Sequence, residues 1–142
     1  MTRDSPSRTQ PAPGGRLVFV GERRSARARQ INASWTNGRL AARTLHAALR
    51  ASGIDPASAI FLNLFEEGDS ALVVNMEALA RLRELAAAEA TIVGLGRKVQ
   101  RALARSGITF LPLTHPAARG RIRARAAYQA HVASVLAVRQ VA

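Results

Sequence analysis

The chain has 142 residues and a formal net charge of +12, from 21 basic and 9 acidic residues. It contains no cysteine, which excludes disulfides and cysteine-ligated zinc or iron–sulfur sites. No apolar run approaches the roughly 20 residues of a membrane span, and the N-terminus has no apolar signal region, so we expect a cytoplasmic protein outside the membrane.

The composition predicts one domain with an aliphatic core. Hydrophobic residues make up 48% of the chain and aromatic residues only 4%. Lys98 is the only lysine, so 20 of the 21 basic residues are arginines. Genome bias explains arginine in place of lysine, but it does not explain the excess of basic over acidic residues. The excess therefore points to a polyanion partner, whose phosphates guanidinium groups match well.

The first third of the chain begins with polar sequence. Residues 1–15, rich in Ser, Pro and Gly, predict a flexible tail, and a single domain is expected over residues 16–142. The apolar run "LVFV" at 17–20 predicts a buried strand. The polar, basic segment 21–38 is then expected to be a long loop, a kind of segment that is often functional.

The middle of the chain alternates a helical pattern with a strand pattern. Leucines and alanines at helical spacing predict a helix over 39–52, capped by Asn37 at its start and closed by Gly53. The apolar run at 59–65 predicts a second buried strand, with Asn63 in its middle.

The last part of the chain repeats this alternation. A helix is expected over 75–90, a strand over 91–96 and a short helix that stops at Gly107. A fourth strand follows at 108–113, and a final helix begins at about Arg121.

Strands that alternate with helices in this way predict an α/β fold, a three-layer α/β/α sandwich around a mostly parallel four-stranded sheet. In such sheets ligands bind at the carboxyl ends of the strands. Four segments should therefore share one rim: Gly21 to Ser25, Asn63, Gly94 to Gly96, and Thr114 to Arg119.

His115 lies after the fourth strand and before Pro116, which restrains its backbone. In the crevice its ring can donate a hydrogen bond to a developing anion, although a lone loop histidine can also be exposed and idle. The arginines after it are either a solvated helix face or a phosphate-binding helix start, and we favour phosphate binding. They are Arg119, Arg121, Arg123 and Arg125.

Three further residues have both a functional and a structural interpretation. Asn63 can read a nucleobase edge or pin a neighbouring loop. Glu22 can position a water molecule or form a salt bridge to Arg23 or Arg24. Trp35, the only tryptophan, can stack on a base or cover the edge of the core.

Gly94 and Gly96 do not complete the G-x-G-x-x-G phosphate loop, because Val99 stands where the motif has its third glycine. We interpret them as turn glycines that let a helix pack closely on the strand. No cluster of His or acidic residues has metal-ligand spacing, so we expect neither a metal nor another cofactor.

In order and spacing, five motifs across residues 16 to about 136 resemble the uracil-DNA glycosylase superfamily. They are "VFVGERRS", "SWTNGRLAARTLHAALRASGI", "FLNLF", "IVGLGRKVQRAL" and "LTHPAARGR". The resemblance implies a DNA-repair enzyme that flips a deaminated base out of DNA and hydrolyses its N-glycosidic bond.

The resemblance also implies a role for each site residue. His115 would stabilise the departing uracil anion, and Glu22 would serve the water or the base. The substrate-binding residues would be Gly21, Trp35, which stacks on the base, and Asn63, which reads its edge. Arg119 would be the wedge or phosphate clamp. Independently of the resemblance, the arginine-rich rim gives the expected DNA-binding set: Arg23, Arg24, Arg119, Arg121 and Arg123.

The first motif departs from the family, because Arg23 and Arg24 follow Gly-Glu where members commonly have proline and a small or acidic residue. The hydrolytic aspartate that some branches carry there is absent. One alternative is therefore a non-catalytic module of the same fold that binds nucleic acid or a partner protein. A further alternative is a small-molecule- or nucleotide-binding α/β domain, whose positive charge would come from genome bias alone.

Overall fold

The computed structural model describes residues 16–117 and 124–141 of the chain, without the side chains of residues 138–141. The predicted flexible tail, 1–15, lies outside the described residues.

The sheet has four strands, all parallel, in the order β2-β1-β3-β4. The strands are β1 (Leu17–Gly21), β2 (Ile60–Asn63), β3 (Thr91–Leu95) and β4 (Leu111–Leu113). The predicted α/β fold with a mostly parallel four-stranded sheet is therefore confirmed.

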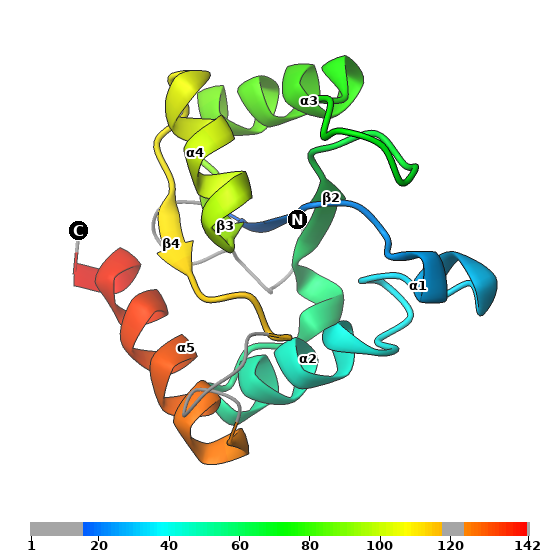
Figure 1. Ribbon diagram of the computed structural model, residues 1–142. Helices are drawn as coiled ribbons and strands as arrows, with labels where there is room; N and C mark the ends of the chain where they lie inside the picture. The colour runs from blue at the N-terminus through cyan, green and yellow to red at the C-terminus, as the bar shows by residue number, and fades with distance from the viewer. Residues whose placement is uncertain (1–15, 118–123, 142) are drawn as a thin grey trace, which may run out of the picture.

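Helices cover both faces of this sheet (Figure 1). Helices α2 and α5 pack on one face, and α3 and α4 pack on the other. The short helix α1 lies at the edge of the molecule, beyond the end of β1 (Figure 1). The helical elements are α1 (Ala26–Gln30), α2 (Ala41–Ala51), the 3-10 turn η1 (Pro56–Ser58), α3 (Met76–Ala87), α4 (Arg97–Arg105) and α5 (Arg125–Val141).

The apolar runs of the strands follow from this burial on both faces. In β1, Leu17 and Phe19 join the core under α2 and α5, whereas Val18 and Val20 join the core under α3 and α4. All four side chains are at most 6% exposed. A strand that is buried on both sides cannot alternate apolar with polar residues, which is why it reads as a continuous apolar run.

The two glycines around the end of β3 have the packing roles that the sequence indicates. A Cβ atom at Gly94 would lie 3.1 Å from Leu103 Cδ1 and 3.3 Å from Gln100 Cγ, so glycine lets α4 approach β3 closely. Gly96 has a φ of +86° at the start of α4, a conformation that favours glycine.

Two predicted strands are too long. The apolar run at 108–113 contributes only Leu111–Leu113 to the sheet, because Ile108 N–H donates to Leu103 O and closes the end of α4. Strand β2 ends at Asn63, although Leu64 and Phe65 remain buried beside the end of β1.

The segment between β1 and α2 also differs from its prediction. It contains the helix α1, whose N-cap Ser25 accepts a hydrogen bond from Ala28 N–H. Asn37 does not cap α2: its Oδ1 accepts from the backbone N–H groups of Ser34 and Arg39 and organises the preceding turn. The N-cap position of α2 is Leu40, with no side-chain cap. The predicted helix start at Arg121 lies outside the described residues, and α5 begins at Arg125.

Candidate functional site

The parallel sheet brings the carboxyl ends of its strands to one edge. Gly21 at the end of β1 is in register with Asn63 at the end of β2, and Leu95 of β3 is in register with Leu113 of β4. A cavity of about 390 Å³ lies at this edge. Its lining includes Glu22, Arg23, Arg24, Trp35, Asn63 and His115. Residues from three separate parts of the chain therefore meet at one cavity.

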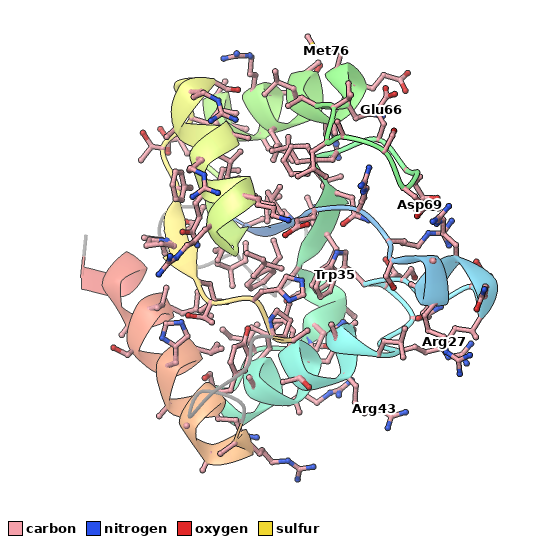
Figure 2. The ribbon with its side chains drawn as sticks, in the orientation of Figure 1. Arg27, Trp35, Arg43, Glu66, Asp69 and Met76 are labelled. Carbon is pink, nitrogen blue, oxygen red and sulfur yellow. The ribbon has the colours of Figure 1, made fainter. Side chains whose placement is uncertain are left out.

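Trp35 is the link between the end of the sheet and the segment before α2. Its side chain points inward near the end of β2, whereas Arg27 and Arg43 point away from the molecule (Figure 2). Its Nε1 donates a hydrogen bond of 2.7 Å to Asn63 Oδ1. A Cβ atom at Gly21 would lie 2.6 Å from Trp35 Nε1, so the indole rests directly on the backbone at the end of β1. Glycine at position 21 is therefore a steric requirement of the tryptophan.

For both Asn63 and Trp35, the structural role and a place in the candidate site occur together. Asn63 pins the segment before α2 through the indole, and it also lines the cavity. Trp35 is partly buried against the core under α2 and α5, and it also lines the cavity.

His115 contacts the indole of Trp35. The His115 and Trp35 rings meet edge to face, with centroids 5.9 Å apart. His115 Nδ1 accepts a hydrogen bond of 3.0 Å from Ala117 N–H, so the neutral ring carries its proton on Nε2. Burial lowers the pKa of His115, and the opposing effect of the Glu22 carboxylate is smaller. His115 is thus a neutral hydrogen-bond donor at neutral pH.

Helix α5 holds the loop that carries His115. Thr114 N–H donates to His131 Nε2 at 3.0 Å, and Tyr128 Oη donates to Thr114 O at 2.8 Å. Gly96, at the start of α4, packs against the same loop, because a Cβ atom there would lie 3.5 Å from His115 Cβ. The position of His115 is therefore set by contacts with the start of α4 and with α5, the helices that precede and follow β4 in the chain.

Glu22 is the only acidic residue that lines the cavity among the residues that the structure describes. Its backbone carbonyl accepts from Phe65 N–H at 2.9 Å, which fixes the chain just beyond β1. The alternative interpretation, a salt bridge to Arg23 or Arg24, is wrong because both guanidinium groups bind elsewhere.

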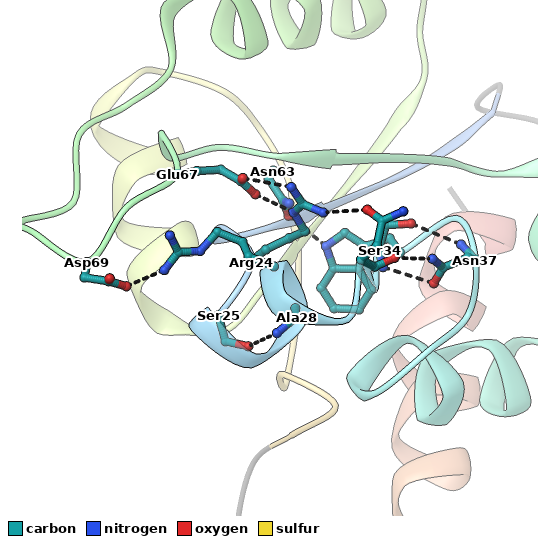
Figure 3. A network of polar contacts seen from close by, with 11 residues as sticks. Arg24, Ser25, Ala28, Ser34, Asn37, Asn63, Glu67 and Asp69 are labelled. Carbon is teal, nitrogen blue, oxygen red and sulfur yellow. Dashed lines mark hydrogen bonds and ion pairs between the residues drawn. The ribbon is translucent and has the colours of Figure 1, made fainter.

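Arg23 and Arg24 reach across to residues 66–70, "EEGDS", which we call the acidic loop. Arg24 makes a two-point contact with Glu67, with Nε–Oε2 and Nη2–Oε1 distances of 2.6 and 2.9 Å (Figure 3). This hydrogen bonding lowers the pKa of Glu67. Arg23 Nη2 donates to Ser70 O at 2.7 Å, and Arg29 pairs with Asp69. Binding of DNA by Arg23 and Arg24 stays a prediction, and Arg119, Arg121 and Arg123 lie outside the described residues.

Helix α4 carries a different set of cations, which we call the α4 basic face. Its members are exposed and have no ion-pair partner among residues 16–117 and 124–137. The first of them, Arg97, follows Gly96, which packs against His115. Because His115 lines the cavity, the α4 basic face begins close to the cavity. The four residues are Arg97, Lys98, Arg101 and Arg105.

Arg39 and Leu40 are among the cavity residues that were not predicted as site residues. Arg39 donates from Nη1 to Ile31 O at 2.8 Å, and Leu40 is 43% exposed with a φ of 55°. A leucine in the left-handed region costs roughly 1–3 kcal/mol, and such strain clusters at functional sites. The "GR" pair at 38–39, within the motif quoted above, is the one sequence signal that points to this place.

Within the described parts of the chain, no group of three His, Asp or Glu residues has an arrangement that could hold a metal ion. No helix there is both long and apolar enough to cross a membrane. Comparison with protein-family models and with curated proteins gives no match to this chain.

Proposed function

We propose that this chain is a DNA-binding hydrolase of the uracil-DNA glycosylase type, which cleaves the N-glycosidic bond of a deaminated base flipped out of DNA. One observation carries the proposal: Glu22, Trp35, Asn63 and His115, which are far apart in sequence, line one cavity at the carboxyl edge of a parallel sheet. The cytoplasm, expected from the sequence, would be the place of this reaction.

The chemistry of the cavity suits a flipped dioxo pyrimidine. His115 Nε2–H and the amide of Asn63 are hydrogen-bond donors, and the carbonyl oxygens of uracil are acceptors. When the bond from C1′ to the base nitrogen breaks, its electron pair stays on the base. The neutral His115 ring can then donate its Nε2–H to the oxyanion that develops on the base.

Glu22 is the candidate for the water-activating group. Water adds to the cationic C1′ carbon and loses a proton to the Glu22 carboxylate, and the base leaves as an anion that is later protonated. No second carboxylate among the described cavity residues shares this task. That single observation favours the second candidate function, a non-catalytic module that binds nucleic acid through the same surface.

An excision assay tests the proposal. A labelled oligonucleotide with one uracil is incubated with the protein, treated with alkali and examined for strand cleavage. We expect cleavage by the wild type and a loss of about 100- to 1,000-fold in His115→Ala, the effect of removing one oxyanion donor. The variant must keep its melting temperature and DNA affinity as a control.

The pH profile gives an independent check of the same residue. Burial lowers the pKa of His115, so the neutral ring persists below pH 6.5. At still lower pH protonation of Nδ1 would remove the hydrogen bond that it accepts from Ala117 N–H and release the ring, so kcat/KM should fall there. Absence of cleavage at every pH, with salt-sensitive DNA binding retained, would favour the non-catalytic module. Cleavage that His115→Ala leaves unchanged would remove His115 from the mechanism.

A further inference from the structure

The amide of Asn63 has one orientation because its neighbour can only donate. Trp35 Nε1 lies 2.7 Å from an amide atom of Asn63, and an indole N–H has no acceptor capacity. The atom that faces the indole is therefore Oδ1. The Asn63 NH2 group must point away from Trp35.

The Asn63 NH2 group is left for a ligand. Asn63 lines the cavity, and Nδ2 has no hydrogen-bond partner among the described residues. The oxygen of the same amide already accepts from the indole, so an N–H donor on a ligand would have to share it. Asn63 consequently presents mainly a donor to the cavity.

The indole that sets this orientation is itself held in place. One part of it rests on the backbone of Gly21, where no side chain would fit. Its ring meets His115 edge to face, at a centroid distance of 5.9 Å. Trp35 is thus confined between the end of β1, the end of β2 and the loop after β4.

We propose that Trp35 is a positioning residue that acts through Asn63. Its indole N–H makes Asn63 a donor, so that the cavity selects a heterocycle with a ring oxo group, a 4-oxo pyrimidine or a 6-oxo purine, over one with an amino group at that position. This rests on the proposed function only in taking the ligand to be a base in DNA.

The selection has a clear physical basis. An amino base would place its own donor against Asn63 Nδ2–H, and rotation of the amide would place that NH2 group against the indole N–H. Either arrangement leaves a donor unpaired, which corresponds to about 5- to 150-fold in affinity. Without the indole N–H the amide can rotate and accept from the amino base, so the preference disappears.

The test measures binding rather than cleavage. The full chain is titrated with oligonucleotides that contain one 2′-fluoro-2′-deoxyuridine or one 2′-fluoro-2′-deoxycytidine, because the fluorine suppresses hydrolysis. The wild type should bind the uracil form about 5- to 150-fold more tightly. In Trp35→Phe, which keeps an aromatic ring and lacks the N–H, the ratio of the two Kd values should fall toward one.

A double-mutant cycle separates this role from a merely structural one. Asn63→Ala should also bring the ratio toward one, and adding Trp35→Phe to it should change the ratio no further, because Trp35 acts through the missing amide. A Trp35→Phe variant that keeps the wild-type ratio, while Asn63→Ala loses it, would overturn the proposal. So would a wild type with no preference for the uracil form.

The NMR signal of the single tryptophan tests the hydrogen bond even if Trp35 variants do not fold. The chain has one indole, hence one indole ¹H–¹⁵N signal. In Asn63→Ala this signal should shift and exchange faster with water, and an unchanged signal would contradict the hydrogen bond. Failure to cleave uracil DNA would count against the proposed function alone, because the binding ratio does not depend on cleavage.

Discussion

The two sides of the cavity differ in how their charged and polar groups are used. On the side of β1 and β2, Arg24 and Arg29 form solvent-accessible ion pairs with Glu67 and Asp69 of the acidic loop. On the side of β3 and β4, the His115 loop is held by neutral hydrogen bonds from helix α5. The cations of that side, on the α4 basic face, have no ion-pair partner among the described residues.

If the protein binds DNA as proposed, the number of arginines does not measure the charge that is available to it. A guanidinium group that binds a carboxylate at two points has much of its attraction satisfied inside the protein. An exposed group without such a partner can bind phosphate and release counterions from DNA. Under the proposed function the α4 basic face is therefore the better candidate to bind the DNA backbone, whereas Arg23, Arg24 and Arg29 contact the acidic loop.

The largest expected effect comes from neutralising the start of the α4 basic face. Arg97→Gln with Lys98→Gln should lower the slope of log Kd against log salt by about 0.9 for each phosphate that the protein no longer neutralises, or about 1.8 in all. Arg81→Gln with Arg83→Gln on α3 removes the same charge and is the control. Equal changes in both double variants would show that only net charge matters.

A smaller change in the salt slope, of opposite sign, is expected when Arg24 is released from its ion pair with Glu67. Glu67→Gln removes the carboxylate that binds Arg24, so that its guanidinium group becomes available to DNA. The salt slope should then steepen by about 0.9, as expected when the protein neutralises one more phosphate. Glu84→Gln on α3, which removes the same charge away from Arg24, should leave the slope nearly unchanged. The comparison of the two sides fails if both variants behave alike.

The smallest expected effect distinguishes the buried neutral hydrogen bond that holds the His115 loop from the exposed ion pair that holds the acidic loop. Tyr128→Phe removes the hydrogen bond to Thr114 O, and Tyr128 is only 1% exposed. The free energy of unfolding should fall by about 1 kcal/mol, equally at low and high salt. Any loss of stability in Glu67→Gln should instead vanish in concentrated salt, because that ion pair is accessible to solvent. Urea unfolding at both salt concentrations checks this, and a salt-dependent loss in Tyr128→Phe would contradict it.

The sequence alone determined the layers of the fold and much of the rim. The apolar runs at 17–20 and 59–65, with a helical period between them, are local signals of buried parallel strands. The rule that such strands share a carboxyl edge then placed Glu22, Asn63 and His115 near one another. The predicted strand at 108–113 is too long, because an apolar residue that closes a helix looks the same in sequence as one that continues a strand.

The partners of these residues depend on the packing of segments that are distant in sequence. Trp35 and Asn63 are 28 positions apart, and Arg24 and Glu67 are 43 positions apart. No spacing rule in the sequence specifies such pairs, because they depend on how the segment before α2 and the acidic loop fold back over the sheet. The sequence could therefore name the arginines and the asparagine, whereas the packing of distant segments settled which arginines are bound and which way the asparagine amide points.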